Sequence, residues 1–250
     1  MLRDIFKGIQ AYFDAFALMR QLKLWHYFII PILISLITAI AIALSAYSFS
    51  DNLNDFIYSL LPWEPASWLK GITEIIMALI IIALGLILYK HIIMALSAPF
   101  MSPVSEKIEA HLLGSHQTHR NTSFQSQLWR GIKLNLRNLL MELVLTIPIL
   151  LLKFIPVVNI FSTALLFAVQ AYYAGFGVMD YTLERHYNYK ESTNFVRRNR
   201  GLAIGNGLMF LAFLFIPVIG VILVLPYSVT AASLKTVERI NSSQQLAAEV

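Results

Sequence analysis

Long apolar runs alternate with short polar segments along this chain of 250 residues. Two of the runs, 27–49 and 72–98, each exceed the roughly 20 residues that a helix needs to cross the hydrocarbon core of a bilayer. Two further apolar blocks, 139–179 and 201–234, are each interrupted near their middle. The pattern predicts an all-α integral membrane protein, with two long transmembrane helices within 27–100 and a helical hairpin in each later block.

The N-terminal segment has the spacing of an amphipathic helix. Its polar side carries Arg3, Asp4, Lys7, Gln10 and Asp14, and its apolar side carries Leu2, Ile5, Phe6, Ile9, Phe13 and Phe16. We expect residues 1–26 to form a helix in the membrane interface, with its aromatic face among the lipid headgroups. Packing of that face on other parts of the chain is the alternative.

The two hairpins share the sequence motif Phe-Ile-Pro-Val where their apolar blocks are interrupted, at 154–159 and 215–220. The arm 201–215 is about three-quarters of a spanning helix. A full crossing of the first hairpin would also leave a small apolar turn in water. Hairpins that enter the bilayer and turn back inside it therefore fit better than spanning hairpins, which remain the alternative.

The distribution of basic residues sets the orientation. Lys and Arg gather before residue 27, in the polar segment 101–138, in the linker 180–200 and in the tail 235–250. The positive-inside rule places these segments and both termini in the cytoplasm. We expect Pro99 and Pro103 to end the second long helix, and the stretch from Asp51 to Trp68 to form an exposed loop on the other side.

Composition narrows the function classes. Hydrophobic residues make up 58% of the chain and charged residues only 13%, which argues against a soluble enzyme. The net charge of +5 lies in short loops between apolar runs, so it indicates juxtamembrane charge and no nucleic-acid partner. Without cysteine or a catalytic motif, we expect no enzyme activity and no cofactor. We assign no metal site, and interpret His111, His116 and His119 as part of a solvated loop.

Ionisable residues inside apolar segments are functional candidates because they are costly to bury in a membrane. Glu142 and Lys153 are eleven residues apart, which places them on one helix face about 16 Å apart along the axis. They are too distant to pair, and they suit the lining of a path between helices, together with Asn159 in the hairpin turn. An interfacial position for both is the alternative. Lys90 and His91 fall near the end of the second long helix, which we expect to project beyond the bilayer.

The chain resembles the family of CysZ sulfate permeases and proteins with etoposide-induced-gene domains. The resemblance rests on words that occur in the family's order: Ile30-Pro31, Ser97-Ala98-Pro99-Phe100, Glu106 and Glu109, Phe154-Ile155-Pro156, Met179-Asp180-Tyr181, and Phe215-Ile216-Pro217 with Pro226. It implies an oligomer in the bacterial inner membrane that admits sulfate or a similar small inorganic anion passively. A membrane scaffold or assembly factor with the same fold is the alternative.

One segment departs from the family's pattern. Family members carry a glycine, an aliphatic residue and one or two arginines before the first spanning helix, and these contact the anion. The matching positions here are Lys23, Leu24, Trp25 and His26. Lys23 and His26 are therefore the candidate anion-binding residues, with Lys153, although neither offers the bidentate geometry of arginine.

Overall fold

The computed structural model describes residues 1–59, 67–114, 122–216 and 219–248, and the regular structure in these ranges is helical throughout. The elements are α1 Leu2–Gln21, the 3-10 helix η1 Leu24–Phe28, α2 Ile29–Ser59, α3 Ser67–Leu113, α4 Phe124–Leu152, α5 Val158–His186, α6 Tyr189–Arg198, α7 Arg200–Leu214 and α8 Ile219–Ala248. Four stretches are long and apolar enough to cross a membrane: Leu24–Phe49, Gly71–Leu113, Phe124–Leu152 and Val158–His186. The prediction of an all-α membrane protein is confirmed.

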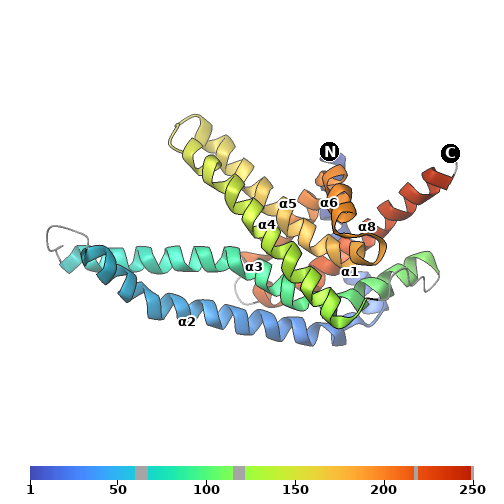
Figure 1. The fold of residues 1–250 in the computed structure, drawn as a ribbon, viewed down its shortest axis with the longest axis horizontal. Helices are drawn as coiled ribbons and strands as arrows, with labels where there is room; N and C mark the ends of the chain where they lie inside the picture. The colour runs from blue at the N-terminus through green and yellow to red at the C-terminus, as the bar shows by residue number, and fades with distance from the viewer. Residues whose placement is uncertain (60–66, 115–121, 217–218, 249–250) are drawn as a thin grey trace.

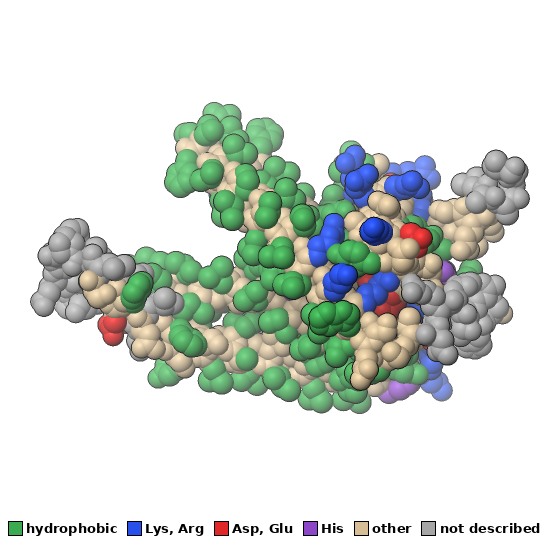
Figure 2. Space-filling view, in the orientation of Figure 1, with side chains coloured by type: hydrophobic (Ala, Val, Ile, Leu, Met, Phe, Trp, Pro, Cys, Tyr) green, Lys and Arg blue, Asp and Glu red, His purple; other side chains and the backbone are tan. Residues whose placement is uncertain are grey.

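Two arms diverge from a common body (Figure 1). One arm is the antiparallel pair α2 and α3, and the other is the pair α4 and α5, while α1, α6, α7 and α8 gather in the body. The surfaces of both arms are covered with apolar side chains (Figure 2). Water-soluble proteins do not leave so much apolar surface exposed. Both arms therefore require a lipid environment.

Helix α1 packs on the body with one face, and its position in the membrane interface stays a prediction for the other face. Phe6 and Phe13 are 68% and 74% exposed, as a face turned towards headgroups should be. The opposite side packs on α7 and α8 through small residues and Tyr12. The Tyr12 hydroxyl donates to the Asn206 carbonyl at 2.9 Å, and burial raises its pKa, so that it stays a neutral donor.

Helices α5 and α7 cross at unusually close range because glycines lie at the contact. A Cβ atom at Gly175 would overlap the carbonyl oxygen of Ala203, and one at Gly207 would overlap that of Ala171. Each helix thus presents an Ala-xxx-Gly pair to the other, a common way for membrane helices to bring their backbones together. Gly201 and Gly205 serve the same purpose against α1. The glycines that weaken α7 as an isolated helix therefore fix its packing.

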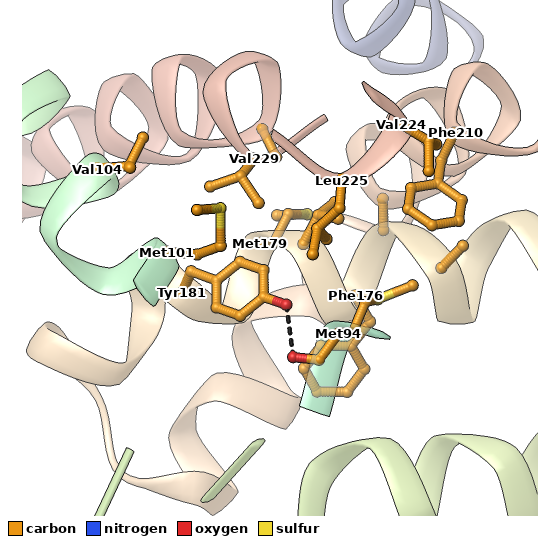
Figure 3. Close-up of a cluster of buried hydrophobic side chains, with 14 of the residues drawn as sticks. Met94, Met101, Val104, Phe176, Met179, Tyr181, Phe210, Val224, Leu225 and Val229 are labelled. Atoms are coloured by element: carbon orange, nitrogen blue, oxygen red, sulfur yellow. Dashed lines mark hydrogen bonds between the residues drawn. The ribbon is translucent and has the colours of Figure 1, made fainter. Parts of the chain in front are cut away.

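The core lies where α3, α5, α7 and α8 meet (Figure 3). Met94 and Met101 from α3 contact a buried cluster that includes Phe176 and Met179 from α5 and Leu225 from α8. The Tyr181 hydroxyl, also from α5, donates to the carbonyl oxygen of Met94 at 2.7 Å. The body is therefore a dry, close-packed unit that holds both arms by one end.

Two boundary predictions were wrong. Pro99 and Pro103 do not end the second long helix, because α3 continues through both to Leu113. Neighbouring helices pack on this stretch of α3: Gly131 of α4 lies against Ala95, four residues before Pro99, and Arg185 of α5 donates to the carbonyl of Ser102, which precedes Pro103. A proline inside a membrane helix is tolerated where such partners exist.

The stretch after residue 50 is also helical, since α2 runs to Ser59 and α3 begins at Ser67. The Tyr58 hydroxyl hydrogen-bonds with that of Thr73, which joins the two helices near this end of the arm. The rest of the expected loop, with Pro62, Trp63, Glu64 and Pro65, lies outside the described residues.

Both apolar blocks are hairpins, as predicted. The first turn, between Leu152 and Val158, has Phe154 85% exposed at its tip, and the second follows Leu214, with Pro217 outside the described residues. Helices α4 and α5 are each long enough to cross a bilayer, whereas α7 has only 15 residues. Half-insertion of the hairpins stays a prediction, which the short length of α7 supports for the second hairpin.

Candidate functional site: buried charges between the helices

Three ionisable side chains meet inside the apolar packing of α3 and α4. Lys90 Nζ lies 2.6 Å from Glu142 Oε1, and His91 Nε2 lies 3.2 Å from Glu142 Oε2. Their exposed fractions are 1% for Lys90, 4% for His91 and 1% for Glu142. The carboxylate thus faces the amine of Lys90 and the ring of His91, and neither of its oxygens is left unpaired.

Two cavities flank this charge cluster of Lys90, His91 and Glu142. The larger, of about 240 Å³, lies between α3, α5 and the end of α7, and its polar lining residues are Lys90 and Gln170. The smaller, of about 160 Å³, lies between α3 and α4, and His91 and Asn135 line it. Within the described part of the chain, His91 Nδ1 and Asn135 Oδ1 have no hydrogen-bond partner. The cluster therefore adjoins space that a small polar species can occupy.

A second group of charged residues, at a distance from the first, ties α3, α4, α5 and α6 together. Arg130 of α4 makes a bidentate contact with Asp180 of α5, at 2.9 and 2.7 Å, and also reaches Ser192 of α6. Nearby, Glu109 of α3 pairs at 2.7 Å with both Arg185 and His186 of α5. Their geometry indicates a structural clamp, since bidentate pairs fix orientation as well as charge.

The predicted anion-binding segment lies at the junction of α1 and α2. Lys23 and His26 are both exposed, and the His26 ring lies 4.1 Å from that of Tyr27. Lys107 from α3 adds a third cation, with its Nζ 4.8 Å above the Tyr27 ring. Lys23 adopts a left-handed conformation, with φ of 50°. Glycine adopts this conformation without strain, so position 23 is one that glycine would suit.

The structure separates the remaining candidates. Lys153 caps the C-terminus of α4 and is partly exposed, and Asn159 is exposed in the first turn of α5, so both lie at the tip of the first hairpin. This tip is far from the segment of Lys23 and His26 (Figure 1). Glu142, by contrast, is buried against α3 and pairs with Lys90, and its depth in the membrane stays a prediction. The five candidates do not form one site.

Sequence reasoning missed Lys90 and His91 as members of the cluster. We expected them to project beyond the bilayer, yet α3 continues past them and buries both. The apolar residues on both sides, 84–88 and 92–96, were the available signal. Of the three histidines assigned to a loop, His111 is exposed at the end of α3, while His116 and His119 lie outside the described residues.

Comparison with known proteins fits this arrangement. The comparison with curated proteins found no match. Residues 11–225 match the family model described as sulfate transporter CysZ/etoposide-induced protein 2.4, a range from the second half of α1 to the first part of α8 that includes both groups of paired charges. The chain belongs to the CysZ/etoposide-induced protein 2.4 family of membrane proteins.

Proposed function

We propose that the protein is a permease for sulfate or a similar small oxyanion in the bacterial inner membrane. The observation that carries this proposal is the cluster of Lys90, His91 and Glu142, which is almost completely buried within apolar helices. Charges in such surroundings are costly, and they persist where they serve the passage of ions or protons. Family membership supports sulfate as the anion.

The other candidate residues take positions that an anion path needs. Lys23 and His26 attract the anion at the cytoplasmic surface, where Lys107 adds to the positive field. Lys153, near the tip of the first hairpin, lowers the barrier for an anion that approaches from the opposite side, and Asn159 lines that approach. A path between tip and cytoplasm that runs along Glu142 calls for several copies of the chain. The proposal contains no catalytic step and no cofactor.

Sulfate flux into liposomes tests the proposal. The purified full-length protein, reconstituted in liposomes, is expected to admit radiolabelled sulfate faster than empty liposomes do. Lys153→Met removes the charge but keeps side-chain length, so it should lower the flux while oligomer size stays unchanged. Lys235→Met is the matched control, because Lys235 pairs with Glu238 on α8 at 2.9 Å, away from the hairpin tip.

The alternative, a scaffold without transport, is supported by one observation. The segment at Lys23 lacks the arginines that the resemblance to the family leads one to expect for holding the anion. A reconstituted protein that is folded but admits no sulfate above the rate of empty liposomes would favour the scaffold over the permease.

A further inference from the structure

The cation of Lys90 has unused hydrogen-bonding capacity. An ammonium group carries three donors, and within the described residues the Nζ atom of Lys90 has a single acceptor, Glu142 Oε1. Lys90 is also one of the two polar residues that line the 240 Å³ cavity between α3, α5 and α7. A buried cation with spare donors beside a cavity is what an anion-binding site requires.

The second polar residue of this cavity comes from another helix. Gln170 of α5 is half-buried, and its side chain carries an amide with two N–H donors. The remaining lining is apolar, from α3, from the end of α7 and from Phe215. The volume far exceeds the 10–15 Å³ that one water requires by the same kind of measure, so an oxyanion with a few waters fits. Apolar walls strengthen the attraction between Lys90 and an anion because they lower the local dielectric.

Glu142 explains how the cation is held when no anion is present. It lies on the α4 side of Lys90, does not line the cavity, and forms its second contact with His91. When the His91 ring is neutral, the charges of Lys90 and Glu142 cancel each other. An arriving anion therefore has to compete with the Glu142 carboxylate for the ammonium group of Lys90. Glu142 is then an internal counter-ion that sets how tightly the cavity binds an anion.

We propose that the cavity of Lys90 and Gln170 is an internal binding site for a small tetrahedral oxyanion, with Glu142 as the competing internal counter-ion. This inference rests on the proposed function and assigns the anion to residues away from the Lys23 segment. Sulfate approaches from the cavity side and receives hydrogen bonds from Lys90 and Gln170, while Glu142 keeps its contact with His91.

Sulfate-dependent thermal unfolding of the full-length protein in detergent tests this site. Sodium sulfate is compared with sodium chloride at equal ionic strength, so that the difference in melting temperature reports specific binding. Glu142→Gln removes the competitor but leaves the cation, and should strengthen sulfate binding roughly tenfold or more. Gln170→Leu keeps volume and charge while it removes the amide, and should weaken binding roughly tenfold.

Removal of Lys90 alone leaves Glu142 without its cation and can prevent folding. The double variant Lys90→Met/Glu142→Leu avoids an unpaired buried charge and should fold but lose the sulfate-specific shift. Lys235→Met is again the matched control and should retain it. The site is refuted if the folded double variant binds sulfate as the parent does, or if Glu142→Gln leaves the affinity unchanged. Sulfate flux through the parent protein is measured separately. Flux without the expected binding changes refutes this site alone, whereas absence of flux refutes the permease proposal.

Discussion

At the scale of single residues, Lys23 raises two separate questions: what its backbone conformation requires and what the charge of its side chain contributes. The left-handed region costs a residue with a Cβ roughly 1–2 kcal/mol, and glycine avoids that cost. Lys23 occupies this region with φ of 50°, at the place where the family has glycine. Lys23 keeps a charge at a strained position in the candidate anion-binding segment. This combination gives a reason to expect that the charge contributes to function.

Lys23→Gly separates the two requirements. Glycine relieves the backbone strain but increases the entropy of the unfolded chain, so the free energy of unfolding should change by less than about 1 kcal/mol. If the charge attracts the anion, sulfate flux through liposomes should nevertheless fall severalfold. Lys23→Arg keeps the charge and serves as the control. Equal flux in the glycine variant and the parent would leave this lysine without a role in anion attraction.

From the sequence alone, Glu142 could be identified as a candidate, but its partners Lys90 and His91 could not. An isolated carboxylate in an apolar run is visible in the sequence, whereas the pairing of residues 52 positions apart depends on how α3 and α4 pack. Lys90 was misplaced for a related reason: the prolines at 99 and 103 predicted an early end to its helix. In the structure α4 packs against α3 at Ala95 and α5 donates to the Ser102 carbonyl, and these contacts leave no local trace in the sequence.

At the scale of elements, the close crossing of α5 and α7 is the contact that most constrains the body. The apolar stretch 201–215 predicted a helix about three-quarters as long as a membrane span. Only the packing shows that Gly175 and Gly207 face backbone carbonyls of the opposite helix. Spacing alone does not reveal which face of a uniformly apolar helix meets a neighbour.

Gly207→Ala tests that crossing, with Gly71→Ala as its control. A methyl group at Gly207 overlaps the carbonyl of Ala171, whereas one at Gly71 of α3 meets nothing within 4 Å. Overpacking should cost about 1–3 kcal/mol at Gly207, while better helix propensity should make Gly71→Ala neutral or stabilising by up to about 1 kcal/mol. Melting temperatures in detergent provide the measurement. Equal melting temperatures for the two variants would contradict the close crossing.

At the scale of the whole molecule, the position of charged anchors along α4 favours a hairpin that stays inside the bilayer. Arg137 lies over the ring of Phe176, at 5.7 Å, and is the last basic residue before the apolar part of α4. From Arg137 to Leu152 a helix rises roughly 22 Å. That is less than the roughly 30 Å of a hydrocarbon core, so with Arg137 at the cytoplasmic interface the tip does not reach the far side. The full length of α4 is sufficient to span only if this arginine enters the core.

Single-cysteine labelling settles the topology, and the chain contains no native cysteine to interfere. Cysteines at Asn52, Gln125 and Asn194 probe the α2 end of the first arm, the start of α4 and helix α6, and all three side chains are exposed. A membrane-impermeant maleimide added outside spheroplasts should label Asn52→Cys. Gln125→Cys and Asn194→Cys should react only after permeabilisation, because the positive-inside rule places the basic segments in the cytoplasm. On the half-inserted arrangement, which places its turn within the hydrocarbon, Asn159→Cys should remain unreactive in both conditions. Labelling of Asn159→Cys from outside would establish a spanning hairpin and move Lys153 into water, which would end its proposed role inside the membrane. Labelling of Asn52→Cys and Gln125→Cys from the same side would instead contradict the crossing of α3.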